Sequence, residues 1–255
     1  MVITSTANEQ IKKIIQLKEK SKARKNTGTF TVEGVKMYSE IPEDELVDTF
    51  VSESFAKENR EVLEGKKYQI VSDGVFKKIS DTVTPQGILA VVKQKSYTVE
   101  QIVARRNKAK SCIVVLDRLQ DPGNLGTIVR TGEGAGISGI IMSNACVDIY
   151  NPKVIRSTMG SIFRVPFAVV EDLPKAVETL KDNGIVTYAA HLKGELYNSG
   201  TLSNDCALLI GNEAKGLSEE VSNQADKLIK IPMEGKVESL NAAVATAILM
   251  YEARR

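Results

Sequence analysis

The stretch CIVVLDRLQDPGNLGTIVRTGEGAGISGIIMS, residues 112–143, decides the fold. It opens with the apolar run CIVVL, passes through a polar loop into the helical pattern LGTIVRTGEGA, and closes with a second apolar run, GIIMS. Two apolar strands joined by a helix are typical of a parallel sheet with helices on its faces. Four further apolar runs follow, separated by helical stretches: VPFAVV, VTYAA, ALLIG and KLIKI. We therefore expect a doubly wound α/β domain over residues 111–255, with its ligand site beyond the carboxyl ends of the strands.

The glycines within this stretch imitate a dinucleotide-binding fingerprint. Gly134, Gly136 and Gly139 fit the pattern G-x-G-x-x-G. That pattern binds a pyrophosphate only where a strand enters the loop and a helix leaves it. Here the helix comes first and the strand follows, so we expect these glycines to end a helix and to permit close packing. This order argues against the alternative of a nucleotide-dependent oxidoreductase.

The chain N-terminal to this domain predicts a smaller α/β domain over residues 1–95, joined by a polar linker over residues 96–110. Thr6 and Glu9 have capping-box spacing, and the apolar stripe after them predicts a helix that ends near Lys20. A basic linker, KSKARKNTG, follows this helix. The strand patterns LVDTFVS, KKYQIVS and QGILAVVK then alternate with the helical patterns SFAKENREVLE and SDGVFKKI.

Charge is distributed unevenly along the chain. The whole chain has a formal net charge of +2, but residues 1–36 hold eight basic and three acidic residues. A solvated helix face with a flexible basic loop is one explanation. The other is a surface that binds RNA phosphates, because clustered basic side chains gain affinity by releasing counterions. On the second interpretation Lys22, Arg24 and Lys25 contact RNA.

Composition excludes several classes of protein. The three cysteines, Cys112, Cys146 and Cys206, are far apart, and His191 is the single histidine, so we expect neither disulfides nor a metal site. The N-terminus lacks the apolar core of a signal peptide, and no apolar run approaches the roughly 20 residues of a membrane span. We expect a cytoplasmic protein that does not contact membranes.

Polar residues follow three of the predicted strands. After the run CIVVL, Asn124 is expected to cap the helix that carries Arg130. Glu213 follows the run LLIG. After the run KLIKI, Ser239 is expected to cap a long alanine-rich helix, and Asn241 lies two residues further on. Each of these residues has a purely structural alternative, such as a helix cap, a surface ion pair or a solvated side chain.

Together the three segments NLGTIVRT, LLIGNEAKGLS and IPMEGKVESLNAAVA resemble, in order and spacing, the motifs of the SpoU/TrmH family of RNA 2'-O-ribose methyltransferases, within the SPOUT superfamily. The resemblance covers residues 111–255 strongly. More weakly, KSKARKNTGTFTVEGVKM resembles the small RNA substrate-binding domain often fused to these enzymes. The resemblance of residues 111–255 to the SpoU/TrmH family implies a C-terminal trefoil knot, a topology that general rules of chain connection would have excluded.

The resemblance also implies the chemistry. S-adenosylmethionine would be the cofactor, held mainly by backbone groups, and a ribose 2'-hydroxyl of RNA would be methylated. The implied cofactor-binding residues are Ala190, Gly211, Ile231, Met233 and Leu240. The implied catalytic residues are Arg130, Asn124, Glu213, Ser239 and Asn241. Arg130 would contact the attacking oxygen, either accepting its proton or stabilising its negative charge.

The partners implied are RNA and a second copy of the chain, forming a homodimer. By analogy with relatives that carry a similar N-terminal domain, ribosomal RNA is favoured over transfer RNA. The long apolar helix LNAAVATAILMY also favours a dimer. Two alternatives remain open: a non-catalytic RNA-binding or ribosome assembly factor of the same fold, and the same chemistry on transfer RNA.

Overall fold

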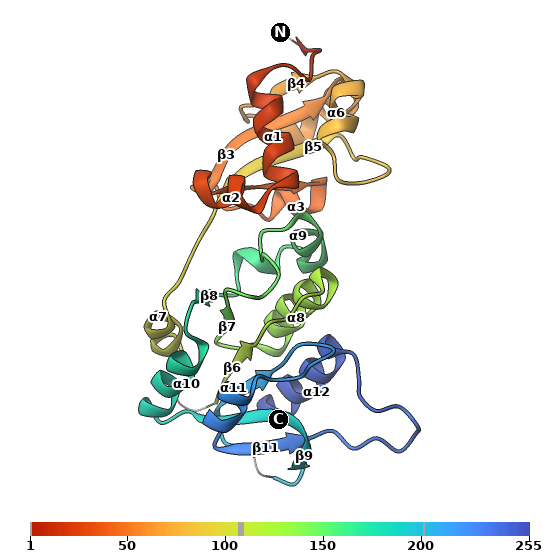
Figure 1. The fold of residues 1–255 in the computed structure, drawn as a ribbon. Coiled ribbons are helices and arrows are strands. Elements are labelled where there is room, and N and C mark those ends of the chain that lie inside the picture. The colour runs from red at the N-terminus through yellow and green to blue at the C-terminus, as the bar shows by residue number, and fades with distance from the viewer. Residues whose placement is uncertain (1, 107–109, 201) are drawn as a thin grey trace. The chain divides into compact units, whose positions relative to one another are not determined.

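The computed structural model describes residues 2–106, 110–200 and 202–255 (Figure 1). Residues 107–109 of the expected linker lie outside this description. The chain folds into two compact units. Unit 1 takes the residues up to Lys95 together with Asp148–Phe163, and unit 2 takes Ser96–Val147 and Arg164–Arg255. Nothing in the sequence marked Asp148–Phe163 as belonging with the N-terminal residues.

Unit 1 is built on a five-stranded mixed sheet in the order β1-β4-β3-β5-β2. Strands β2 and β3 are antiparallel to β5, whereas β4 is parallel to both β1 and β3. The strands are β1 (Val2–Ile3), β2 (Thr29–Glu33), β3 (Leu46–Ser52), β4 (Gln69–Val71) and β5 (Ile88–Lys93). The helices are α1 (Glu9–Glu19), α2 (Ser21–Thr27), α3 (Val35–Ser39), α4 (Glu53–Glu58), α5 (Arg60–Leu63), α6 (Asp73–Ile79) and α9 (Pro152–Thr158), with a 3-10 turn at Ser161–Phe163.

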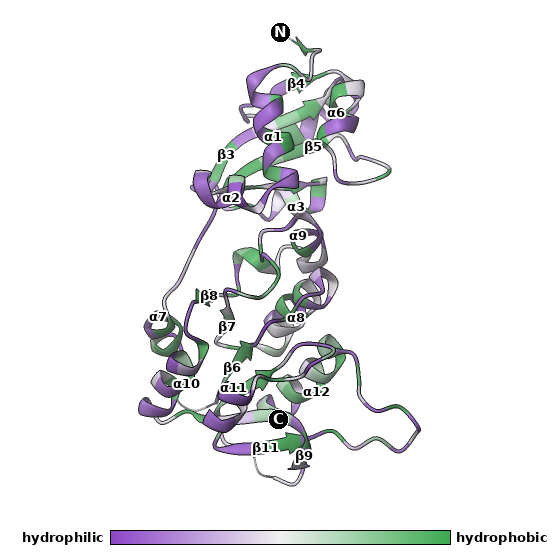
Figure 2. Cartoon of the chain, viewed as in Figure 1, coloured by the Kyte–Doolittle hydropathy of each residue, from purple (hydrophilic) through white to green (hydrophobic). Residues whose placement is uncertain are grey.

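The apolar stripes of α1 and α6 form the core of this unit with the sheet. Ile11, Ile14 and Leu17 of α1 are fully or almost fully buried, and they pack with Phe76 of α6 and Phe50 of β3. Figure 2 shows the same division, with hydrophobic residues on the strands and hydrophilic ones on the outer faces of the helices. The predicted helix that ends near Lys20 is confirmed as α1.

Three local predictions in unit 1 were wrong. Asn8, not Thr6, caps α1, because its side chain accepts the Gln10 N–H. The expected basic linker is the helix α2, which ends where Gly28 adopts a left-handed backbone, φ 61°. Only Arg24 of α2 is buried, so no apolar stripe marked this helix in the sequence. The predicted helix over residues 54–64 is two short helices, α4 and α5.

Unit 2 is a doubly wound α/β fold. Its six strands lie in the order β11-β9-β10-β6-β7-β8, and every neighbouring pair is parallel. This confirms the parallel sheet that the apolar runs predict. The strands are β6 (Ser111–Leu116), β7 (Gly139–Ser143), β8 (Phe167–Val170), β9 (Val186–Leu196), β10 (Asp205–Ile210) and β11 (Lys227–Lys230).

Helices cover both faces of this sheet. The helices α7 (Val99–Ala104), α10 (Leu173–Asp182) and α11 (Glu219–Gln224) share one buried apolar cluster with alternate strand residues such as Val115 and Leu209. The helices α8 (Pro122–Ala135) and α12 (Ala242–Arg254) pack together, and α12 contacts β6 and β10 (Figure 1). No helix in the described part of the chain is long and apolar enough to cross a membrane.

Gly136 and Gly139, two of the three glycines of the imitated fingerprint, have the roles that we expected, whereas Gly134 lies within α8. Gly136 ends α8 in a left-handed conformation, φ 70°. Gly139 begins β7, where a Cβ atom would lie 2.9 Å from the Ile102 side chain and 3.0 Å from the Pro166 carbonyl oxygen. Neither contact leaves room for a side chain, so these glycines serve helix termination and close packing.

Both helix caps predicted in unit 2 were wrong. Pro122 is the first residue of α8, and Asp121 is its cap, with Oδ1 accepting the Asn124 N–H at 2.7 Å. Asn124 is therefore inside the helix, and its side chain is available for other contacts. Asn241, not Ser239, caps α12, because its Oδ1 accepts the N–H groups of Ala243 and Val244.

Candidate functional site

A cavity of about 600 Å³ opens beside three segments of unit 2. The segments are residues 190–193 of β9, the loop that follows β10, and the chain from the end of β11 into α12. All five residues implied as cofactor-binding line it: Ala190, Gly211, Ile231, Met233 and Leu240. Glu213 and Ser239 line it as well. The cavity follows strands β9, β10 and β11, where a doubly wound fold is expected to bind its ligand.

An irregularity in β9 supplies one wall of the cavity. Ala189 pairs with Leu228 of β11, but the next residue of β11, Ile229, pairs with Glu195. Residues 190–194 are therefore left out of the pairing, and Ala190 and the three residues after it line the cavity. Gly194 returns the chain to the sheet, since a Cβ atom there would lie 2.4 Å from the Ile229 backbone nitrogen.

The loop after β10 forms a second wall. Asn212 and Gly216 exchange two backbone hydrogen bonds, at 3.0 and 2.9 Å, which close the loop. The Asn212 side chain also accepts the N–H groups of Ala214 and Lys215. A Cβ atom on Gly211 would lie 2.1 Å from the carbonyl carbon of Gly216, so only glycine fits at that position. Sequence reasoning missed Asn212, although asparagine favours turns because its side chain can bond the backbone two residues on, as it does here at Ala214.

A chain of hydrogen bonds joins the three motif segments. The Asn124 side chain donates to Glu213 Oε1 at 3.0 Å. Its own carbonyl oxygen accepts from the Asn241 side chain at 2.9 Å. Asn241 in turn caps α12, as described above. The structure thus brings Asn124, Glu213 and Asn241 together, although they come from three distant parts of the sequence.

Glu213 is held as a carboxylate. Besides Asn124, the backbone N–H groups of Gln120 and Asp121 donate to it at 3.2 and 3.1 Å. Burial by itself would raise the pKa of Glu213, but these hydrogen bonds outweigh burial and hold the pKa below its ordinary value. Glu213 is therefore ionised at neutral pH and fixes the loop that precedes α8.

Arg130 has a different environment from this network. It lies on the exposed side of α8, six residues after Asn124 and thus about 9 Å further along the helix. It does not line the cavity, and within the described ranges no hydrogen bond or ion pair to its guanidinium is seen. Its guanidinium is open to solvent and to a ligand.

Of the three basic residues predicted to contact RNA, two are exposed and one is buried. Lys22 and Lys25 of α2 are exposed. Arg24 is only 3% exposed, and its Nε and one terminal nitrogen donate to Asp148 at 2.9 and 2.7 Å. Its other terminal nitrogen donates to the Leu17 carbonyl at 2.7 Å. Arg24 therefore holds residues 148–163 against α1 and α2 within unit 1 and has no free donor face for RNA.

His191, the single histidine, lines the cavity, a position that no sequence signal indicated. Its Nδ1 accepts the Lys193 N–H at 3.1 Å. Among the described residues, no group of three or more His, Cys, Asp or Glu side chains could hold a metal ion.

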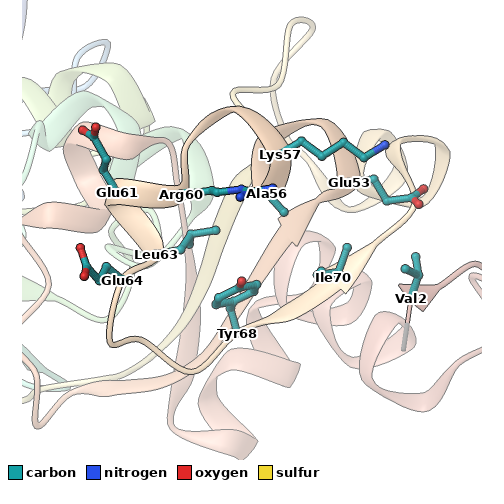
Figure 3. A pocket seen from close by; sticks show the side chains of 10 residues that line it. All are labelled: Val2, Glu53, Ala56, Lys57, Arg60, Glu61, Leu63, Glu64, Tyr68 and Ile70. Carbon is teal, nitrogen blue, oxygen red and sulfur yellow. The ribbon is translucent and has the colours of Figure 1, made fainter.

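Unit 1 contains a pocket of similar size, about 630 Å³, beside α4, α5 and β4 (Figure 3). Its rim mixes Lys57 and Arg60 with three glutamates, and Tyr68 lies on its apolar side. None of the predicted site residues lines this pocket. Volume alone therefore does not distinguish the two cavities, but the cavity of unit 2 is the one lined by residues of the second and third motif segments.

Comparisons with known proteins identify the family of the chain. The sequence pattern of the SpoU rRNA Methylase family matches residues 111–251, and that of the MRM3-like substrate binding domain matches residues 8–90. The chain is 33% identical over 254 residues to the 23S rRNA (guanosine(2553)-2'-O)-methyltransferase RlmP of Bacillus subtilis, covering 99% of this chain and 98% of that relative.

Two solved structures that contain the cofactor AdoMet, S-adenosylmethionine, are similar over nearly the whole chain. One is an AdoMet-bound rRNA methyltransferase from Sinorhizobium meliloti, with a TM-score of 0.83, 30% identity and coverage of 100% of this chain and 97% of that one. The other is the SpoU methyltransferase AviRb from Streptomyces viridochromogenes in complex with AdoMet, with a TM-score of 0.86, 25% identity and coverage of 97% of each chain.

Proposed function

The chain belongs to the SpoU rRNA Methylase family, and from this premise we propose that it transfers a methyl group from S-adenosylmethionine to a ribose 2'-hydroxyl of ribosomal RNA. The observation that carries the proposal is that the second and third motif segments line one cavity of unit 2, while Asn124 of the first is hydrogen-bonded to Glu213 and Asn241 of the other two. Ribosomal RNA is the substrate class because the relative from Bacillus subtilis, similar over its full length, methylates 23S rRNA.

The cavity suits a cofactor of this class. At about 600 Å³ it lies within the usual range of about 300–1,000 Å³ for small-molecule sites. Ile231, Met233 and Leu240 give it an apolar lining, while Ala190 and Gly211 bring backbone close to the ligand. Bound there, the cofactor supplies a sulfonium methyl group that is already activated for transfer, so the protein has to orient the ribose and manage one proton.

Arg130 is proposed as the catalytic residue that contacts the attacking oxygen. An arginine guanidinium keeps its positive charge in nearly any protein site, so it is a poor proton acceptor. Its guanidinium instead donates hydrogen bonds to the ribose oxygen and stabilises the negative charge that develops there. The proton then leaves through an RNA phosphate or water. The exposure of Arg130 supports this role, because among the described residues no internal partner competes for its guanidinium.

Asn124, Glu213 and Asn241 are proposed to position this centre. The Glu213 carboxylate holds the loop before α8 and orients the Asn124 amide, which in turn orients Asn241 at the start of α12. Ser239 lines the cavity and is exposed, so its hydroxyl is available to the ribose or the cofactor. In this scheme the network sets geometry, and Arg130 and Ser239 touch the reacting groups.

RNA is proposed to contact Lys22 and Lys25 on the exposed side of α2. Arg24 does not contact RNA in this proposal, because its guanidinium nitrogens donate to Asp148 and to the Leu17 carbonyl within unit 1 and are not available to a phosphate. Its role is to position α2 and residues 148–163.

Three further features belong to the proposal. A homodimer is supported by α12, where Val244 and Tyr251 are 48% and 56% exposed and would be covered by a second copy. Family membership supports a trefoil knot in the C-terminal part of the chain. A cytoplasmic location is supported by the ribosomal substrate and by the three free cysteines.

The proposal is tested by incubating the purified protein with labelled S-adenosylmethionine and ribosomal RNA from a strain that lacks the gene. We expect label at one ribose, mapped by resistance of the adjacent phosphodiester to alkali. Transfer to transfer RNA alone would replace the substrate. Binding of RNA without any transfer, under conditions where the cofactor also binds, would favour the non-catalytic assembly factor.

A further inference from the structure

The loop between β6 and α8 contains an arginine in an unfavourable backbone conformation. Arg118 has φ 57°, in the left-handed region. Among the residues that the structure describes, Met159 is the other non-glycine residue with a positive φ. A side chain other than glycine, asparagine or aspartate costs about 1 kcal/mol or more in this region. Stability of the loop alone would therefore favour glycine, asparagine or aspartate at this position.

The left-handed turn is maintained by neighbours and not by the arginine side chain. The Arg118 N–H donates to Ser143 Oγ at 3.1 Å. Its carbonyl oxygen accepts from the side chains of Asn212 at 2.8 Å and Gln120 at 3.2 Å. All three bonds involve the Arg118 backbone, so a glycine at position 118 would keep every one of them.

The Arg118 side chain forms an ion pair with Asp117. Its Nε lies 3.2 Å from Asp117 Oδ1, yet this buried Nε is without a well-directed hydrogen bond. The Asp117 carboxylate already accepts a hydrogen bond from the Ser218 N–H at 2.7 Å, through Oδ2. The Arg118 side chain is 38% exposed, and in the described part of the chain no hydrogen bond to its two terminal nitrogens is seen. The planar end of the guanidinium is therefore available to a ligand.

Arg118 lies beside the proposed reaction centre. Asn212, whose side chain donates to the Arg118 carbonyl, lines the cavity. Glu213, which also lines it, accepts from the backbone N–H groups of Gln120 and Asp121 in the same loop. Three carboxylates, Asp117, Asp121 and Glu213, surround this loop. The Arg118 guanidinium places a positive charge among them, which favours the approach of an RNA phosphate to this side of the loop.

We infer that Arg118 binds a phosphate of the RNA strand next to the ribose that is methylated, an inference that rests on the proposed function. A guanidinium suits this task because its planar donors match two phosphate oxygens at once. An arginine at this strained position therefore serves substrate binding and does not serve the stability of the fold. Arg118 is thus a substrate-positioning contact, separate from Arg130, which acts on the attacking oxygen.

The test compares Arg118→Gly and Arg118→Lys with a matched control, Lys175→Ala, which removes one exposed positive charge from α10 of the same unit. For Arg118→Gly we expect an unchanged or higher melting temperature and unchanged affinity for S-adenosylmethionine. We expect its KM for RNA to rise about tenfold, with the salt dependence of RNA binding falling by about 0.7 in log–log slope, one phosphate contact. Arg118→Lys should lose less, and Lys175→Ala should match the wild type.

Two outcomes overturn the inference. A melting temperature several degrees lower in Arg118→Gly would make Arg118 the ion-pair partner that stabilises Asp117. Wild-type RNA affinity and salt dependence in Arg118→Gly would remove the phosphate contact. Failure of the proposed function is seen separately, because the wild-type protein would then transfer no methyl group to ribosomal RNA.

Discussion

Arg24 and Arg130 show how differently two regions of this molecule use the same side chain. Both lie in segments that the sequence marks as functional, and both are followed by a short run of small or polar residues. In α2, Arg24 is 3% exposed and bonded to Asp148 and to the Leu17 carbonyl. In α8, Arg130 is exposed. The difference teaches that an arginine already bonded inside a unit positions that unit, whereas an arginine without an internal partner is free to act on a substrate.

The largest effect is expected at the exposed arginine. Arg130→Ala and Arg130→Lys should both fold and bind S-adenosylmethionine, because Arg130 does not line the cavity. Both should lower the single-turnover rate of methyl transfer by about 10²-fold or more, the usual loss when a donor to a developing negative charge is removed. Lysine keeps the charge but lacks the planar fork. Rates equal to wild type at saturating RNA would show that Arg130 only binds substrate.

The next largest effect is expected at the buried arginine and should appear in stability. Arg24→Met leaves the Asp148 carboxylate without its cation, and breaking such a buried pair costs about 3 kcal/mol in the free energy of unfolding. Urea unfolding measures this cost. The double variant Arg24→Met with Asp148→Leu should recover part of it, and Lys25→Ala serves as the exposed control. If Arg24→Met instead unfolds as the wild type does and loses RNA affinity, Arg24 belongs with the RNA contacts.

A smaller effect is expected at Glu213. Glu213→Gln keeps the shape but weakens the hydrogen bonds from Asn124 and the loop, so we expect about a tenfold lower maximal rate with the RNA KM unchanged, because the residue positions the centre without touching RNA. A raised KM with an unchanged maximal rate would contradict this.

The same variant changes acid stability. The folded pKa of Glu213 is lowered, so its stabilising effect is complete above about pH 4.3, the ordinary value for glutamate, and is lost as pH falls through the lower folded pKa. Wild type should therefore lose stability more steeply than Glu213→Gln below about pH 4. Thermal unfolding at pH 3 to 6 compares the two slopes.

The smallest effect is expected at the exposed lysines of α2. Lys22→Ala with Lys25→Ala should weaken RNA binding severalfold at moderate salt and lower the log–log salt slope by about 1.4, two phosphate contacts. Affinity for S-adenosylmethionine should not change. Filter binding over a salt series gives both quantities. An unchanged slope would leave α2 as a solvated helix, the alternative that its charge also allowed.

Prediction from sequence was most accurate in unit 2 and least accurate in unit 1. The apolar runs at β6, β7 and β10 are long and bounded by turns, so their strand assignments hold to within two residues. The two-residue strand β1 is too short to leave a periodic signal. Helix α2 buries a charged residue in place of an apolar stripe, so the sequence indicated a linker.

The helix caps failed for a related reason. Asp121, Asn124, Ser239 and Asn241 are all residues that cap helices, and several stand within a few positions of each helix start. Composition does not choose among them. The choice was made by Pro122 at the first helical position of α8 and by the Asn241 side chain, which reaches two N–H groups of α12.

By itself the sequence determined the parallel sheet of unit 2, its covering helices and the three motif segments, because these follow from local periodicity and short motifs. Only the tertiary structure decided which side chains are partners. Arg24 and Asp148 are 124 positions apart, and Asn124 and Glu213 are 89 apart. The left-handed backbone of Arg118 is likewise held by Ser143 and Asn212, 25 and 94 positions away. Such contacts leave no local pattern, because each residue type at those positions is compatible with a solvated surface until the fold brings its partner within hydrogen-bond distance.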